Sequence, residues 1–224
     1  MTVKKQLFEQ LAKMAQAISS PQRLELLDYL AQAERSVEEL SELAELSVAN
    51  TSQHLQVLKQ KSLVEVRKKG NQRFYYLASD QVIKLISTLR ETAESQLTEV
   101  NQLIESYLTK KDELSPISHE QLIELSESGR VVILDVRPEK EFLQGHILNA
   151  INVPPETLSQ QIDQLEMMNH QTPIVTYCRG PYCLFAHEAA EILRKKGFKA
   201  QRLMDGFPEW KAAGLPVQST AQTK

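Results

Sequence analysis

The sequence predicts two domains: a mainly α N-terminal domain that ends in a β-hairpin, and an α/β C-terminal domain with a parallel sheet. Three observations predict this arrangement. Helical periodicity dominates the first 110 residues, with one interruption of strand character. The charged, proline-broken segment "KKDELSPIS" follows. Beyond it, short apolar runs alternate with helical patterns, as in α/β domains. We therefore expect domains at 1–110 and 118–218, a linker at 111–117 and a tail at 219–224.

Capping residues mark two helix starts in the first domain. Ser20 is a candidate N-cap and Pro21 suits the first helical position of "SPQRLELLDYLAQ". In "SVEELSELAEL", Ser36 and Glu39 have the spacing of a capping box. After a brief break, a third amphipathic helix is expected over "VANTSQHLQVLKQK".

The periodicity then changes to that of strands. "LVEVRKKGNQRFYYLA" predicts a β-hairpin with its tip at Lys69-Gly70-Asn71, and Gly70 is the only glycine among the first 128 residues. From Asp80 to about Tyr107, apolar residues at three- and four-residue steps predict one long helix. Its narrow apolar seam favours pairing with a second helix, and hence a homodimer, over packing within its own domain.

Composition excludes several classes of protein. The chain has 224 residues, 42% of them hydrophobic and 25% charged, with a formal net charge of −3. No apolar run is long enough to cross a bilayer, so we expect no membrane partner. The N-terminus is typical of an amphipathic helix and not of a secretory signal. Two cysteines do not make a disulfide framework, and we expect a cytoplasmic protein.

Positive charge is concentrated in one segment. Between Ser47 and Ala78 a single acidic residue, Glu65, faces six basic residues: Lys59, Lys61, Arg67, Lys68, Lys69 and Arg73. A local excess of this size can hold a polyanion, although such a cluster is more often a solvated face.

Three short helices followed by a charged hairpin describe a winged helix-turn-helix, in which the second helix of the pair enters the DNA major groove. The segment "SVANTSQHLQVLKQKSLVEVRKKGNQRFYYL" resembles the ArsR-type bacterial repressors, and the resemblance extends from residue 4 to about 108. It implies double-stranded operator DNA as partner. The residues expected to face the groove are Ala49, Asn50, Thr51, Ser52, Gln53 and His54, and those expected on phosphates are Lys59, Lys68, Lys69 and Arg73. For His54, simple packing is the alternative.

The first domain lacks the metal-sensing residues of many ArsR-type proteins. The first 177 residues contain no cysteine, and residues 80–110 contain no histidine. If this regulator senses a signal, we expect the sensor to lie in the second domain.

Both cysteines lie in "VTYCRGPYCLFAHEAAEIL". Cys178 ends an apolar strand, and a tight loop leads from it to a helix start. Backbone N–H groups and the helix dipole at such a place favour a thiolate and would also stabilise an added anionic sulfur. The chemistry expected is attack of the thiolate on a sulfane sulfur, which leaves a persulfide on the cysteine.

The second half resembles the rhodanese domain over residues 117 to about 217. The matching pieces are "VVILDVRPEKEFLQGHILNAINVP", the loop that opens with Cys178, and "MDGFPEWKAAGLPV". The resemblance implies that Cys178 carries the persulfide, that Asp135 and Arg137 buttress the active-site end of the sheet, and that thiosulfate or a persulfide is the sulfane sulfur donor. We expect no cofactor and no metal.

The loop departs from the pattern of active rhodaneses at its end. It closes with Cys183, so Arg179 is its only charge, and we therefore do not expect efficient turnover of thiosulfate. Cys183 either resolves a modified Cys178 into a disulfide or is a small apolar filler. A third interpretation, that both cysteines and His187 bind a soft metal, is the weakest.

These patterns together predict a homodimeric DNA-binding repressor whose rhodanese-like domain senses reactive sulfur at Cys178. Two rivals stay open: a sulfurtransferase tethered to a DNA-binding module, with catalysis independent of DNA, and an inert domain that recruits another protein.

Overall fold

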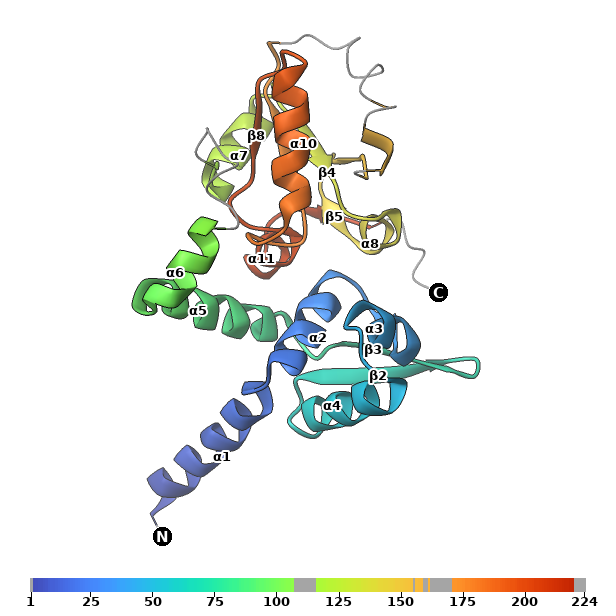
Figure 1. The fold of residues 1–224 in the computed structure, drawn as a ribbon, viewed down its shortest axis with the longest axis vertical. Helices are drawn as coiled ribbons and strands as arrows, with labels where there is room; N and C mark the ends of the chain where they lie inside the picture. The colour runs from blue at the N-terminus through green and yellow to red at the C-terminus, as the bar shows by residue number, and fades with distance from the viewer. Residues whose placement is uncertain (1, 107–115, 155, 159–160, 162–170, 220–224) are drawn as a thin grey trace. The chain divides into compact units, whose positions relative to one another are not determined.

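The computed structural model describes residues 2–106, 116–154, 156–158, 161 and 171–219. The chain divides into two compact units, Met1–Ile86 and Ser87–Lys224. The helices and strands of both units are drawn in Figure 1.

The first unit is mainly α with one small sheet. Its helices are α1 (Val3–Ile18), α2 (Pro21–Gln32), α3 (Val37–Leu43), α4 (Val48–Gln60) and the start of α5 (Asp80–Gln96). Its strands are β1 (Arg35–Ser36), β2 (Val64–Lys69) and β3 (Gln72–Leu77), which form an antiparallel sheet in the order β1-β3-β2. The short strand β1 was not predicted, because two residues between helices carry no strand periodicity.

The predicted helix starts are confirmed. The Ser20 side chain accepts a hydrogen bond from the backbone N–H of Arg23, with Pro21 in the first helical position. Ser36 and Glu39 form a reciprocal capping box, with the two bonds at 3.2 and 2.9 Å. The hairpin is also confirmed, because Gly70 and Asn71 join β2 to β3 and Gly70 has a φ of +62°, a conformation that glycine adopts without strain.

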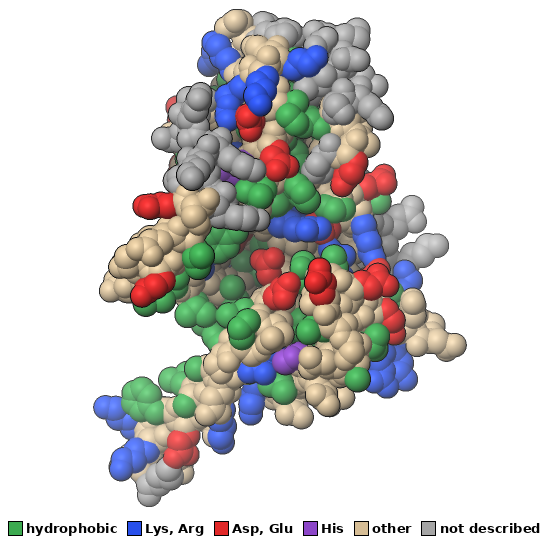
Figure 2. Space-filling view, viewed as in Figure 1, with side chains coloured by type: hydrophobic (Ala, Val, Ile, Leu, Met, Phe, Trp, Pro, Cys, Tyr) green, Lys and Arg blue, Asp and Glu red, His purple; other side chains and the backbone are tan. Residues whose placement is uncertain are grey.

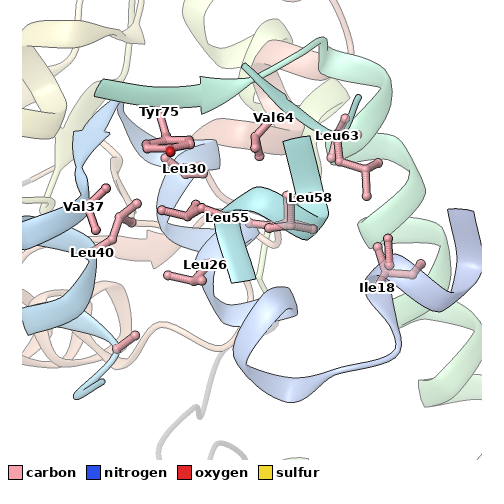
Figure 3. Close-up of a cluster of buried hydrophobic side chains, with 14 residues drawn as sticks. Ile18, Leu26, Leu30, Val37, Leu40, Leu55, Leu58, Leu63, Val64 and Tyr75 are labelled. Carbon is pink, nitrogen blue, oxygen red and sulfur yellow. The ribbon is translucent and has the colours of Figure 1, made fainter. Parts of the chain in front are cut away.

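One apolar core holds the helices on the sheet. Leu26, Leu30, Leu40, Leu55 and Leu58 interlock beneath Tyr75 of β3 (Figure 3). Val82 of α5 belongs to the same cluster. Helix α1 contributes only its end to this core, Ala17 and Ile18, and its earlier residues are exposed.

The prediction of a single long helix from Asp80 to about Tyr107 is wrong. Helix α5 ends at Gln96, Leu97 is extended, and α6 covers Thr98–Ile104. The Asn101 side chain donates to the Glu94 carbonyl at 2.7 Å, so a side chain bonds a carbonyl of the last turn of α5. Residue 107 lies outside the described residues.

The second unit is α/β. Its helices after α6 are α7 (His119–Glu127), α8 (Glu139–Gln144), α10 (Leu184–Lys195) and α11 (Phe207–Ala212). Its strands are β4 (Val132–Asp135), β5 (His146–Ile147), β6 (Ile151–Asn152), β7 (Ile174–Tyr177), β8 (Ala200–Arg202) and β9 (Val217–Gln218). The main sheet is parallel with the order β6-β4-β7-β8, and β5 pairs with β9.

Helices cover both faces of the parallel sheet, which explains why its strands are apolar on both sides. Leu134 and Ile174 pack with Ala189 and Leu193 of α10 on one face. Ile133 and Val175 pack on the other, against Leu122 of α7 and the α11 residues. The parallel α/β expectation is therefore confirmed.

Two sequence expectations fall largely outside the described residues. One of the helical patterns of the second domain covers residues 156–166, and of these, residues 156–158 and 161 are described and are helical. Of the linker expected at 111–117, Pro116 and Ile117 are described, and Ile117 is buried and forms a parallel bridge with Leu203. Among the helices in the described part of the chain, none combines the length and apolar character that spanning a bilayer needs.

Candidate functional site

The exposed side of α4 carries the polar residues expected to read DNA. Ala49, Asn50 and Gln53 are exposed, and Ser52 and His54 are half-buried. Ser47 caps the helix by accepting a bond from the Asn50 N–H at 3.2 Å. The start of α4 therefore presents an amide pair, Asn50 and Gln53, that can bond adenine edges.

The expectation that Thr51 faces the DNA groove needs correction. Its side chain is fully buried, and its hydroxyl donates to the Ser47 carbonyl at 3.1 Å. The reason is helical spacing, because Thr51 is four residues before the core residue Leu55 and shares its face. Its hydroxyl is thus not on the exposed face of the helix.

Burial and a nearby cation both affect the pKa of His54. Burial lowers the pKa of its imidazole below the ordinary 6.5, and the Arg23 guanidinium lowers the pKa further. Arg23 is held by the α1 carbonyls of Gln16, at 2.9 Å, and of Ala17. Both effects favour the neutral imidazole over the charged form.

A groove of about 640 Å³ runs between α4 and the hairpin, lined in part by Lys59, Lys68 and Arg73. Lys68 and Arg73 are direct partners across the hairpin, and both are exposed, as is Lys69. Arg67 is different, because its guanidinium binds the Glu34 carboxylate. Cations from two elements therefore line one groove, an arrangement suited to phosphates.

The two cysteines meet at the end of the parallel sheet. Cys178 follows β7 directly and is buried, and Cys183 is the N-cap residue of α10. They form a disulfide with their α-carbons 6.2 Å apart. The loop curvature that a resolving role requires is therefore present.

The loop between the cysteines, residues 178–183, packs against the start of α11. The Phe207 N–H donates to the Cys178 carbonyl at 3.1 Å. A Cβ on Gly206 would lie 2.4 Å from the Arg179 carbonyl carbon and the Gly180 nitrogen, so no side chain fits there. Close approach of two backbones thus sets the position of this cysteine loop.

Arg179, the one charge in the cysteine loop, is bound by Glu141 of α8. Its Nε lies 3.1 and 3.0 Å from the two carboxylate oxygens, and its Nη2 lies 2.7 Å from Oε1. The Glu141 side chain is 1% exposed and that of Arg179 is 22% exposed. The guanidinium is therefore compensated by a buried carboxylate.

Asp135 and Arg137 hold the end of β4. Both side chains are fully buried, and Arg137 Nη2 donates to Asp135 at 2.6 Å and to the Gly145 carbonyl at 2.7 Å. The Tyr177 hydroxyl donates to Asp135 at 2.6 Å and accepts from the Ile147 N–H. Burial and then the Asp135 charge raise the pKa of Tyr177 well above its usual value. These groups join strand ends and have no exposed surface for a sulfur donor.

A polar cluster connects the cysteine loop to the second half of α5, which belongs to the same unit. The Tyr182 hydroxyl donates to the Glu94 carboxylate. Arg90 donates to Glu209 at 2.9 Å, and Glu209 in turn accepts from the Gly206 N–H at 3.2 Å. Burial, and then the bond to Glu94, raise the pKa of Tyr182. Two sets of hydrogen bonds thus join α5 to the cysteine loop and its neighbour Gly206: one through Glu94, and one through Arg90 and Glu209.

Sequence reasoning missed Glu141, Gly206 and the α5 residues Arg90 and Glu94. Glu141 lies in the charged stretch "PEKEFLQ", where nothing in the sequence distinguishes it from Glu139. Gly206, in "MDGFPEW", carries a weak signal, because glycine permits close approach of two backbones. No sequence signal pairs α5 with the loop. Across the described residues, no three His, Cys, Asp or Glu side chains gather as a metal site.

A winged helix with a basic groove, followed by an α/β unit with a cysteine loop, defines a DNA-binding regulator with a rhodanese-like domain. Comparison with known proteins agrees. The profile described as "Bacterial regulatory protein, arsR family" matches residues 20–66, and that of the rhodanese-like domain matches residues 118–213.

One of the relatives matches nearly the whole chain. The HTH-type transcriptional regulator Rv0324 of Mycobacterium tuberculosis is 36% identical over 215 residues, 96% of this chain and 93% of that protein. The chain therefore belongs to the arsR family of bacterial transcriptional regulators, and it carries a rhodanese-like domain.

Each half also has its own relatives. The thiosulfate sulfurtransferase GlpE of Shewanella oneidensis is 33% identical over 98 residues, 43% of this chain and 92% of that protein. The homodimeric winged helix-turn-helix domain of Mb0332 from Mycobacterium bovis, a solved structure, is 32% identical with a TM-score of 0.42, covering 44% of this chain and 92% of that one.

Proposed function

We propose that the protein is a homodimeric, cytoplasmic repressor that leaves its operator DNA when reactive sulfur modifies Cys178. The observation that carries the proposal is the pairing of Cys178 with Cys183 at the end of β7. A cysteine with a resolving partner in reach can convert a sulfur signal into a reversible covalent change.

The proposed chemistry needs no oxidant besides the sulfur donor. The Cys178 thiolate attacks the sulfane sulfur, the donor's S–S bond breaks, and the donor's remaining sulfur group leaves with the electron pair. The Cys183 thiolate then attacks the Cys178 sulfur, and hydrosulfide leaves with the added sulfur. Two thiols are oxidised to a disulfide, and the sulfane sulfur is reduced to sulfide.

Coupling to DNA is proposed to run through α5. Val82 at its start packs in the core of the first unit, and Arg90 and Glu94 contact Glu209 and Tyr182 in the second. A modification shifts DNA binding only by the difference in its free energy between two states. Forming the Cys178–Cys183 bond is proposed to alter the contact of Tyr182 with Glu94, and this is where such a difference would arise.

DNA is proposed to lie along α4 and the hairpin. Asn50, Gln53 and His54, with Ala49 and Ser52 beside them, would face base edges, and Lys59, Lys68, Lys69 and Arg73 would hold phosphates. Lysine and arginine contacts position the protein, and the amides select the sequence.

The homodimer is proposed to use α1. Val3, Leu7, Leu11 and Met14 repeat along one side of this helix, and Phe8 lies beside them, with exposed fractions from 39% to 71%. Hydrophobic side chains gather along this helix, at the lower left of Figure 2. An apolar stripe of this length on an exposed helix favours burial against a second copy.

The test compares DNA affinity before and after sulfur treatment. The reduced protein first selects a duplex from a random-sequence library, and its Kd for that duplex is measured. Brief exposure to an organic hydropersulfide should yield the Cys178–Cys183 disulfide by mass spectrometry and raise the Kd at least about fivefold, the low end of typical couplings. Cys178→Ser should keep its affinity under the same treatment, and Cys183→Ser should stop at a persulfide. Equal loss of affinity in Cys178→Ser would refute the proposal.

A tethered sulfurtransferase is the second candidate, and the similarity to GlpE favours it. The sulfurtransferase hypothesis predicts many turnovers with thiosulfate and cyanide. In each turnover, sulfur passes from Cys178 to cyanide and the thiol is regenerated. The hypothesis also predicts that sulfur treatment leaves the Kd for DNA unchanged. One experiment, turnover measured beside DNA affinity, separates the two candidates.

A further inference from the structure

The charges around the cysteine loop are unfavourable for a doubly charged anion. Three arginines lie on or beside the loop: Arg90, Arg137 and Arg179. Each is bound by carboxylates, which together are Glu94, Asp135, Glu141, Asp205 and Glu209. By formal charge, three arginines against five carboxylates leave this set at −2.

The cysteine loop's own cation is compensated most closely. Arg179 binds Glu141 through both Nε and Nη2, at distances of 2.7 to 3.1 Å. Because Glu141 is 1% exposed, its charge is not screened by water as a surface carboxylate would be. An anion that approaches Cys178 therefore meets a neutral ion pair in place of a cation.

We infer that Glu141 determines donor selectivity at Cys178: by neutralising Arg179 it favours organic hydropersulfides, whose electrophilic form is uncharged, over the thiosulfate dianion. The inference rests on the proposed reaction of Cys178 with sulfane sulfur. Glu141 touches Arg179 and acts through it, so it is a specificity-determining residue that does not take part in bond making.

The favoured reaction balances without a further reactant. The Cys178 thiolate attacks the outer sulfur of RSSH, the donor S–S bond breaks, and RS⁻ leaves and takes up a proton. Cys183 then displaces hydrosulfide from the Cys178 persulfide. In total, RSSH and two thiols give RSH, H₂S and the disulfide.

The test measures the rates at which full-length reduced protein reacts with thiosulfate and with an alkyl hydropersulfide whose alkyl group is uncharged, by quenched mass spectrometry of Cys178 and Cys183. The readout is the ratio of the thiosulfate rate to the hydropersulfide rate. This ratio cancels changes in the thiolate fraction, because both donors react with the same thiolate. The wild type should prefer the hydropersulfide, and Glu141→Gln should raise the ratio about tenfold, as expected for one unit charge released near a dianion.

Two further variants separate charge from loss of structure. Arg179→Gln breaks the same ion pair but leaves no cation, so its ratio should not rise above that of the wild type. Glu139→Gln makes the same charge change on the exposed first turn of α8 and should leave the ratio unchanged. The increase in Glu141→Gln should also diminish at high salt.

The outcomes distinguish the selectivity from the proposed function. A wild type that reacts with thiosulfate as fast as with the hydropersulfide overturns the selectivity, as does an unchanged ratio in Glu141→Gln or an equal rise in Arg179→Gln. If Glu141→Gln does not fold, a rise in the Arg179→Gln ratio still overturns it. Failure of Cys178 to react with either donor overturns the proposed function itself.

Discussion

The Tyr182 hydroxyl donates a hydrogen bond to the Glu94 carboxylate, and thereby joins the cysteine loop to α5. Tyr182 is four residues after Cys178, and Glu94 is on the helix whose first turns pack in the winged-helix core. The guanidinium of Arg90 lies 5.9 Å from the centre of the Tyr182 ring and reinforces the connection. The cysteine loop is therefore in contact with the helix whose first turns pack in the winged-helix core.

Tyr182→Phe should weaken the effect of disulfide formation on DNA affinity. Disulfide formation by hydropersulfide should proceed as in the wild type, because the hydroxyl is not at the reacting sulfur. The ratio of DNA affinities between the reduced and disulfide forms should shrink by about two- to tenfold, the scale of the net contribution of one typical hydrogen bond. The matched control is Tyr29→Phe, which removes a hydroxyl bonded to the Leu43 carbonyl in the first unit. An unchanged affinity ratio in Tyr182→Phe would exclude this path.

Gly206→Ala should slow disulfide formation. The new Cβ would lie 2.4 Å from the backbone of Arg179 and Gly180, so the cysteine loop must shift away from α11. We expect the rate to fall by about tenfold or more, because about 1 Å of misplacement is costly for a reacting pair. Gly180→Ala is the control within the same loop, since a Cβ there has no atom within 4 Å. Rates are followed by loss of free thiol, and equal rates for the two variants would contradict the packing argument.

Lys68→Gln on the hairpin should weaken DNA binding to all sequences by a similar factor. A phosphate contact carries no base preference, and its loss should reduce the slope of log K against log salt by about 0.9. Binding is measured by fluorescence anisotropy from 50 to 200 mM salt. Lys195→Gln, an equally charged change on the exposed surface of α10, should leave both affinity and slope unchanged. If Lys68→Gln lowers the affinity for some DNA sequences and not for others, Lys68 contacts a base.

His54 should make DNA affinity pH-dependent. Burial and Arg23 lower its pKa below 6.5, so it is neutral at pH 7 and becomes positive as the pH falls through that lowered value. A new positive charge beside phosphates strengthens binding, so affinity should rise on acidification, and the salt slope should steepen by up to about 0.9. His54→Gln should lack this increment in the same titration. Parallel pH profiles for both proteins would show that His54 does not face DNA.

Leu11→Glu should dissociate the homodimer. Leu11 is 62% exposed in the middle of the apolar stripe of α1, and a carboxylate there would be buried without a partner in an interface. Sedimentation equilibrium should show a dimer for the wild type and a monomer for the variant, with the far-UV circular dichroism preserved. Gln10→Glu places the same charge on the same exposed helix and serves as the control. A variant that stays dimeric would place the interface elsewhere.

Local chemistry made much of the fold predictable. Ser20 and Ser36 cap their helices because side-chain oxygens at those positions satisfy free backbone N–H groups. Gly70 forms the hairpin turn because it adopts a positive φ without strain. The continuous apolar runs of β4 and β7 predicted a sheet covered on both faces. Each of these signals lies within a few residues of its effect.

The sequence by itself determined the two-part architecture, the hairpin with its basic residues, and the strand-end position of Cys178. Tertiary structure decided that Thr51 is buried, that α5 ends at Gln96, and that Glu141 compensates Arg179. It also decided that Tyr182 meets Glu94, 88 residues earlier in the chain. Periodicity and capping act through neighbouring residues and are visible in a sequence. Ion pairs and close backbone approach depend on which segments folding brings together, and no local pattern records them.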